Sequence, residues 1–126
     1  MLHIRFHSPV LSDEALPAPV PEVIVSGERL LAGGKEVATH HNNSWHHAGR
    51  VFTVVLVEGA CRVRFESAGA PAPAEYGPYS GVKVVDGSIR FGPEYREMVA
   101  RLDEANERWV LYSGPGAWDR AVIVPA

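Results

Sequence analysis

Histidine is concentrated in one short segment of the chain, His40-His41-Asn42-Asn43-Ser44-Trp45-His46-His47, which holds four of the six histidines. Neutral imidazole is the commonest nitrogen ligand for Zn, Cu, Ni and Fe in proteins, and its ordinary pKa lies near neutral pH. The segment therefore predicts a site for a transition metal (Zn, Ni, Fe or Cu) or for a small polar ligand. The predicted metal ligands are His40, His41, His46 and His47. A solvated, histidine-rich turn is the alternative interpretation.

The asparagine pair in this segment predicts a chain reversal, because asparagine tolerates left-handed backbone conformations. If the chain reverses over residues 42–45, His41 faces His46 and His40 faces His47, with Cβ atoms about 4.5–5.5 Å apart in each pair. Side chains alternate across a strand, so the two pairs would point to opposite faces. A hairpin then offers two imidazoles per site and needs another ligand, whereas an irregular loop could converge three or four. Carboxylates near strand ends that could complete the site are Glu36, Glu58 and Glu66.

The most apolar part of the chain follows the histidines. Residues 51–57 and 60–66 predict a hairpin joined at Glu58-Gly59, since glycine supplies the positive φ of a tight turn. In a two-residue loop Leu56 pairs with Cys61, and the apolar residues of both strands share one face. We expect this hairpin to be the centre of the core, with Cys61 a small buried hydrophobe and not a nucleophile.

Alternating polarity over residues 2–7 predicts a strand. Further short strands are predicted over residues 22–25, 29–32, 35–39 and 109–112, and an apolar strand over residues 121–124. Asp86-Gly87 lies between residues 82–85 and 88–91, which predicts a type I′ hairpin with Val84 opposite Ile89 and Lys83 opposite Arg90.

One amphipathic helix is predicted at about residues 93–107. Pro93 suits the first helical position. Tyr95, Met98, Val99 and Leu102 follow the spacing i, i+3, i+4, i+7 and would form one apolar stripe against the sheet. The predicted fold class is therefore mainly β (α+β), an antiparallel β-sandwich or barrel with one helix, as a single domain over residues 1–126.

The segment 67–81 is rich in Pro, Gly and Ala and is expected to be a loop bearing Tyr76 and Tyr79. The predicted hairpin register places this loop at the same end of the sheet as His46 and His47. Tyr76, Tyr79 and Trp45 are therefore candidate ligand-binding residues. The alternative is that the tyrosine rings only hold the loop against its own domain.

Composition limits the classes of partner. Twelve basic and 15 acidic residues give a net charge of −3, without the basic patch of a nucleic-acid or anionic-membrane binder. No apolar run approaches the length of a membrane span or a signal-peptide core. The single cysteine excludes an internal disulfide. We expect a soluble cytoplasmic protein whose partner is a small polar ligand or another protein; a homo-oligomer is compatible with the sequence.

Residues 45–59, followed by Arg62-Val-Arg-Phe65, resemble the first conserved half-motif of the cupin β-barrels, and the resemblance spans about residues 40–65. In that family, histidines precede a strand pair whose turn carries a glycine, and they bind a transition metal. The resemblance implies a closed β architecture and a metal-dependent enzyme. Phe52 stands where the family has an acidic ligand, and no histidine follows His47 to supply the second half-motif.

Together these features predict a small β-rich domain that binds a ligand or transition metal at residues 40–47. Binding is favoured over catalysis, because the chain has no paired carboxylates of recognisable spacing and no Ser/His/Asp or Cys/His signature. Two alternatives remain open. One is a protein-interaction module (an inhibitor, adaptor or assembly subunit) with incidental histidines, and the other is a cupin-like metal-dependent enzyme.

Overall fold

The computed structural model describes residues 1–68, 72–92, 97–103, 105–112 and 116–126. All regular secondary structure in these ranges is β-strand, and none of these residues belongs to a helix that could cross a bilayer. The strands are β1 (His3–His7), β2 (Glu14–Ala15), β3 (Val23–Ser26), β4 (Arg29–Ala32), β5 (Lys35–His41), β6 (Ser44–His47), β7 (Arg50–Phe52), β8 (Val54–Glu66), β9 (Ala74–Val85), β10 (Ser88–Phe91), β11 (Glu97–Asp103), β12 (Arg108–Leu111), β13 (Ala117–Trp118) and β14 (Arg120–Pro125).

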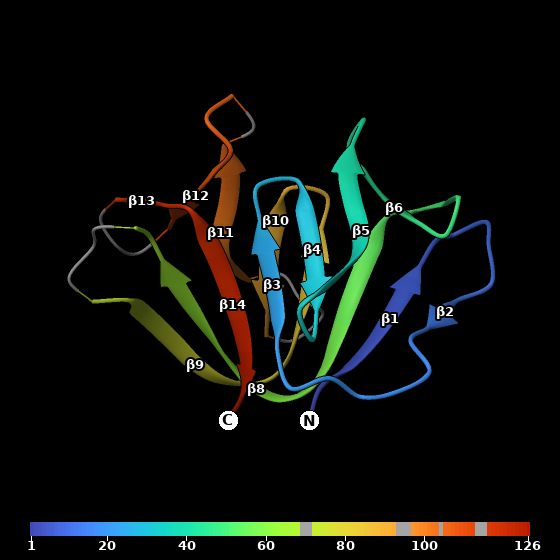
Figure 1. The fold of residues 1–126 in the computed structure, drawn as a ribbon, viewed down its shortest axis with the longest axis horizontal. Coiled ribbons are helices and arrows are strands. Elements are labelled where there is room, and N and C mark those ends of the chain that lie inside the picture. Colours follow the sequence, from blue (N-terminus) through green and yellow to red (C-terminus); the bar gives the residue numbers. More distant parts are fainter. Residues whose placement is uncertain (69–71, 93–96, 104, 113–115) are drawn as a thin grey trace.

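The strands form one continuous antiparallel sheet that folds over itself into two layers (Figure 1). Its order is β13-β12-β11-β10-β9-β8-β14-β3-β4-β5-β6-β7, with β1 pairing β8 and β2. The long strands β8 and β9 belong to both layers. The first half of β8 pairs β1 and the second half of β9, whereas its second half pairs β14 and the first half of β9.

Strand β8 replaces the predicted hairpin over residues 51–66, so that prediction is wrong. Odd-numbered apolar residues from Val55 to Phe65 are buried along one continuous strand, and this alternation passes through Gly59. The register with β9 shifts between Glu58 and Cys61, where β8 bends at the end of the molecule that holds both termini (Figure 1). Gly59 has φ of 124°, and a Cβ there would lie 3.2 Å from the carbonyl oxygen of Met1. The glycine therefore serves a bend and a close approach within one strand.

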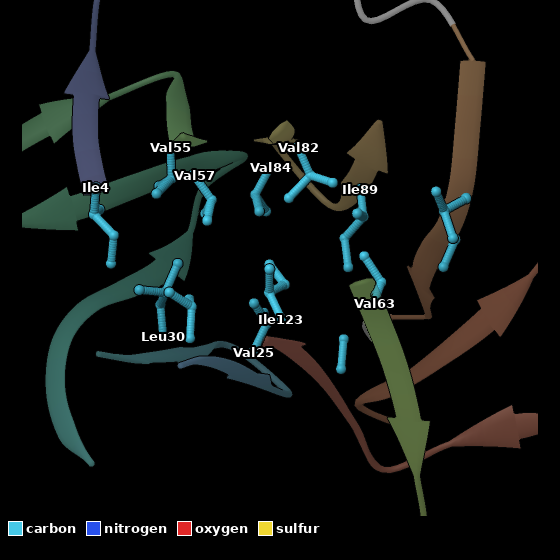
Figure 2. Close-up of a cluster of buried hydrophobic side chains, with 14 of the residues drawn as sticks. Ile4, Val25, Leu30, Val55, Val57, Val63, Val82, Val84, Ile89 and Ile123 are labelled. Atoms are coloured by element: carbon cyan, nitrogen blue, oxygen red, sulfur yellow. The ribbon is translucent and has the colours of Figure 1, made fainter. Parts of the chain in front are cut away.

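The core fills the space between the two layers. Figure 2 shows Val55, Val57, Val82, Val84 and Ile89 of one layer facing Val25, Leu30 and Ile123 of the other. All eight side chains are fully buried. Cys61 is also fully buried, as the sequence predicts. Aligned sheets that bury their inner faces in this way are the arrangement of a β-sandwich.

Several short-range predictions are confirmed. Strands occur at each of the six short segments predicted to be strands, within one or two residues of the expected ends. The two-residue turn at Asp86-Gly87 joins β9 to β10 with Val84 opposite Ile89 and Lys83 opposite Arg90, as predicted. The predicted turn type is wrong, because a type I′ turn needs positive φ at both residues and only Asp86, with φ of 53°, has it.

The predicted helix is not present in the described residues. Residues 97–103 form β11, which pairs β10 on one side and β12 on the other, and residues 105–107 form a turn; Pro93, Glu94, Tyr95, Arg96 and Glu104 lie outside the described residues. Ala100 and Leu102 are buried with Arg101 exposed between them, which is the strand period. Two sheet ladders satisfy the backbone here, so tertiary pairing overrides a helical apolar spacing.

Candidate functional site

The histidine segment forms a tight hairpin between β5 and β6. Asn42 and Asn43 are the two turn residues, with φ of 52° and 59°. This is the two-residue turn for which asparagine is suited. His41 therefore lies opposite Ser44 and Thr39 lies opposite His46. The predicted reversal over residues 42–45, with His41 directly opposite His46 and His40 directly opposite His47, is wrong, because the turn is shorter by two residues.

His40 is a buried residue, only 1% exposed. Its Nε2 lies 2.9 Å from Oδ1 of Asp86, and its ring centroid lies 5.1 Å from that of Trp45. A carboxylate only accepts hydrogen bonds, so Nε2 carries the hydrogen. This bond joins β5 of one layer to the β9–β10 turn of the other. Trp45, a predicted ligand-binding residue, is also 1% exposed and is part of the core.

His41 and His46 lie together on the outer face of the hairpin as diagonal cross-strand neighbours. Their rings stack with centroids 3.6 Å apart and an interplanar angle of 11°. His46 Nε2 donates a hydrogen bond to the main-chain oxygen of His41, at 3.2 Å. His41 is exposed and His46 is half-buried. These two are the only predicted ligands whose rings meet.

His47 has a third environment. Its Nδ1 donates to the main-chain oxygen of Val37 at 2.7 Å, and its ring stacks on Phe6 with centroids 4.1 Å apart. The four imidazoles thus do not converge on one point. Within the described ranges, no group of three or more His, Cys, Asp or Glu side chains is placed to hold a metal ion.

The carboxylates proposed to complete a metal site have arginine partners. Glu36 pairs with Arg29, Glu58 with Arg5, and Glu66 with both Arg64 and Arg120. Partial burial tends to raise the pKa of Glu66, but hydrogen bonds from Arg120 and Arg64 hold it below its ordinary value. These acids contribute to surface ion pairs and do not lie with the histidines.

The two candidate tyrosines lie on β9, so the predicted loop over residues 67–81 is strand from Ala74 onward. Tyr76 packs edge-on against Phe65, with ring centroids 6.0 Å apart, and Tyr79 packs against Phe91 at 4.2 Å. Burial raises the pKa of the Tyr79 phenol. Their predicted position beside the histidines depended on the hairpin that β8 replaces. The structure instead uses both rings in packing.

A cleft of about 720 Å³ lies beside the histidine hairpin. The tips of the β5–β6 and β11–β12 hairpins project at the same end of the molecule, on either side of the β3–β4 turn (Figure 1). The cleft is lined by the β3–β4 turn with its flanking residues, the end of β5, residues 106–108, and the residue that precedes β14: Ser26, Gly27, Glu28, Arg29, Thr39, His40, His41, Asn106, Glu107, Arg108 and Asp119.

Sequence reasoning missed the half of the cleft formed by Asn106, Glu107 and Arg108, since it assigned these residues to or beside a helix. A usable signal was present, because Asp and Asn favour turns. Asn106 Nδ2 donates to Oδ2 of Asp103 at 2.9 Å. This hydrogen bond lowers the pKa of Asp103 and closes the turn that carries the cleft wall.

The two arginines of the cleft have ion-pair partners among the described residues, whereas two of its carboxylates do not. Arg29 pairs with Glu36, and Arg108 lies 3.4 Å from Asp119 and donates to the main-chain oxygen of Ala117 at 2.7 Å. No ion pair joins Glu28 or Glu107 to another described residue. A Cβ at Gly27 would lie 3.5 Å from Cβ of Glu107, so the β3–β4 turn packs closely against the tip of the opposite hairpin.

Comparison of the chain with protein-family models, with curated proteins and with solved structures gives no match. The resemblance to the cupin barrels is therefore not tested by these comparisons.

Proposed function

We propose that this protein is a non-catalytic binding domain whose cleft, between the β5–β6 and β11–β12 hairpins, holds a small polar ligand that carries an amino group. The observation that carries the proposal is the cleft itself, with two carboxylates that lack an ion-pair partner among the described residues, beside His41 of the histidine segment.

The volume of the cleft suits a small molecule. Ligand sites are usually clefts of about 300–1,000 Å³, and the value of about 720 Å³ lies within this range. The lining is mostly hydroxyl, amide and charged side chains. Such a lining favours a hydrogen-bonding ligand, such as an amino sugar, over an apolar one, because an apolar ligand would leave these groups without partners.

The arrangement of charge supports an amine. The two arginines that line the cleft already have carboxylate partners, Glu36 and Asp119. Glu28 and Glu107 have no ion-pair partner in the part of the chain that the structure describes, and they can accept from a donor on the ligand. A charged hydrogen bond between an ammonium group and a carboxylate is stronger than a neutral one, so a cationic ligand gains most from this site.

Binding is favoured over catalysis because of the state of His40. Its ring is buried and its Nε2–H is bonded to Asp86. A general base must reach the proton that it removes. His40 belongs to the cleft lining, but its ring is buried against Asp86, so the more accessible lining residues supply the recognition groups.

Isothermal titration with three sugars of the same ring size tests the proposal. Glucosamine, glucose and glucuronate differ mainly in charge, and we expect affinity to fall in that order. Glu107→Gln and Glu28→Gln should each weaken glucosamine binding about tenfold, the equivalent of one charged contact. Glu22→Gln makes the same chemical change outside the cleft and should have no effect. Equal affinity for the three sugars, or an equal loss in Glu22→Gln, would overturn the proposal.

A further inference from the structure

We infer that His41 and His46 form a two-histidine chelating site for a divalent transition-metal ion such as Zn²⁺. The site shares His41 with the proposed cleft, but it can be tested apart from the cleft ligand, because His46 does not line the cleft. It narrows the four histidines of the segment to the two whose rings meet on the outer face of the β5–β6 hairpin.

The spacing of the two rings suits chelation. Zn–N bonds are about 2.0–2.1 Å long, so two imidazole nitrogens on one ion lie roughly 3 Å apart. The ring centroids of His41 and His46 lie 3.6 Å apart, which is close to this separation. Stacked rings direct their lone pairs side by side, and rotation of the His41 ring about χ2, with His46 held by its hydrogen bond, is needed to make them converge. This torsion is broad for histidine, so the rotation costs little.

The hydrogen bond that His46 makes through one ring nitrogen is the kind that metal-binding histidines usually make. Its Nε2 donates to the main-chain oxygen of His41, which fixes the tautomer and leaves the lone pair on Nδ1. Histidines that bind metals in proteins nearly always donate their other ring N–H to a carboxylate, a backbone carbonyl or water. The hairpin therefore presents Nδ1 of His46 as a ligand, and His41 supplies the second imidazole from the adjacent strand.

The other two histidines of the segment have different tasks. His40 is buried against Asp86 and Trp45, and the ring of His47 stacks on Phe6. Moving either ring to the outer face would break a hydrogen bond and a packed ring contact. Two imidazoles leave the remaining coordination positions of the ion to water or to a bound molecule, as in open zinc sites. Imidazole nitrogen selects transition metals over Mg²⁺, which prefers oxygen ligands.

Isothermal titration of tag-free protein with ZnCl₂, and separately with MgCl₂, tests the inference. We expect saturable binding of one Zn²⁺ and no binding of Mg²⁺. His41→Ala and His46→Ala should each weaken Zn²⁺ binding at least about tenfold, because a single imidazole loses the gain of chelation. His3→Ala removes a histidine from β1, outside this pair, and is the matched control. Circular dichroism establishes that each variant is folded.

Imidazole ¹⁵N shifts give a second measurement on unmodified protein. Zn²⁺ should move the ring resonances of His41 and His46 and leave those of His40 and His47 in place. Persistence of Zn²⁺ binding in His46→Ala, an equal loss in His3→Ala, or no saturable binding to the unmodified protein would overturn the inference. Its failure is distinguishable from that of the proposed function, since His46→Ala should not alter glucosamine affinity and Glu107→Gln should not alter Zn²⁺ affinity.

Discussion

The histidines of residues 40–47 have different hydrogen-bond partners and are therefore expected to hold different tautomers. His47 donates through Nδ1 to a carbonyl, whereas His40 and His46 donate through Nε2. Long-range ¹H–¹⁵N correlation spectra should show the Nδ1–H form for His47 and the Nε2–H form for His40 and His46. One common tautomer for all three would contradict the geometry described here.

Asp86 has two roles, as the acceptor for His40 and as a turn residue with positive φ. Asp86→Ala leaves the buried Nε2–H without its carboxylate and should lower the free energy of unfolding by about 1–3 kcal/mol. Asp86→Asn keeps an acceptor oxygen and tolerates positive φ, so it should lose less than half as much. Urea unfolding of both variants measures the difference; equal losses would show that the bond to His40 contributes nothing.

The thiol of Cys61 makes the free energy of unfolding depend on pH in the alkaline range. Burial raises the pKa of its thiol from 9.0 to about 11. Between these values the unfolded chain releases the proton while the folded chain keeps it. The contribution of this thiol to the free energy of unfolding is therefore fully present below about pH 9. It is lost as the pH rises toward about 11, by at most about 1.4 kcal/mol per pH unit. Urea unfolding at increasing pH should show this fall, and Cys61→Ala should lack it. The same fall in Cys61→Ala would assign it to other groups.

At the scale of elements, adjacent residues of β8 distinguish a continuous strand from the hairpin that the sequence suggests. The predicted hairpin would bury Leu56, whereas the observed strand buries Val57 fully and leaves Leu56 half-exposed. Val57→Ala should lower the free energy of unfolding by about 2 kcal/mol through transfer and cavity terms. Leu56→Ala should cost less than about 1 kcal/mol although it removes more atoms. Chemical denaturation measures both losses. A larger loss for Leu56→Ala than for Val57→Ala would support the predicted hairpin instead of the continuous strand.

Short-range signals in the sequence were sufficient to predict much of the sheet. Asp86-Gly87 predicts the position and pairing of its turn, and short runs rich in apolar residues between turn residues predict the short strands. The hairpin predicted at Glu58-Gly59 is wrong because a glycine with positive φ suits a bend within a strand as well as a tight turn. The apolar spacing at Met98, Val99 and Leu102 misled because it also fits a strand that pairs on both sides, and only the positions of β10 and β12 decide between the two structures.

At the scale of the site, the sequence identified the histidine hairpin but not what surrounds it. His40 and Asp86 are 46 residues apart, and this bond depends on how the two layers meet. The cleft similarly joins the β3–β4 turn, the end of β5 and residues 106–108, with Asp119. The pattern of residues within one segment does not predict that these segments lie together, because their proximity follows from the order of strands in the folded sheet.

The whole molecule is a folded-over sheet in which one end carries the termini and the bend of β8, and the opposite end carries the hairpin tips (Figure 1). Trp109 of β12 donates through Nε1 to the main-chain oxygen of Val25 in β3, at 3.1 Å, which ties the two layers together below the cleft turns. A core shared by both layers therefore holds the two walls of the cleft in position. This separation leaves the turns free to carry recognition groups.

The most direct test of the central claim, that the end of the molecule between the two hairpins is a ligand site, is a titration of ¹⁵N-labelled protein with glucosamine followed by amide chemical shifts. We expect saturable shifts at Gly27, Thr39, His41, Asn106 and Glu107, with little change at Gly59 or Val57 at the opposite end. Absence of shifts, or saturable shifts confined to residues outside the cleft, would contradict the account.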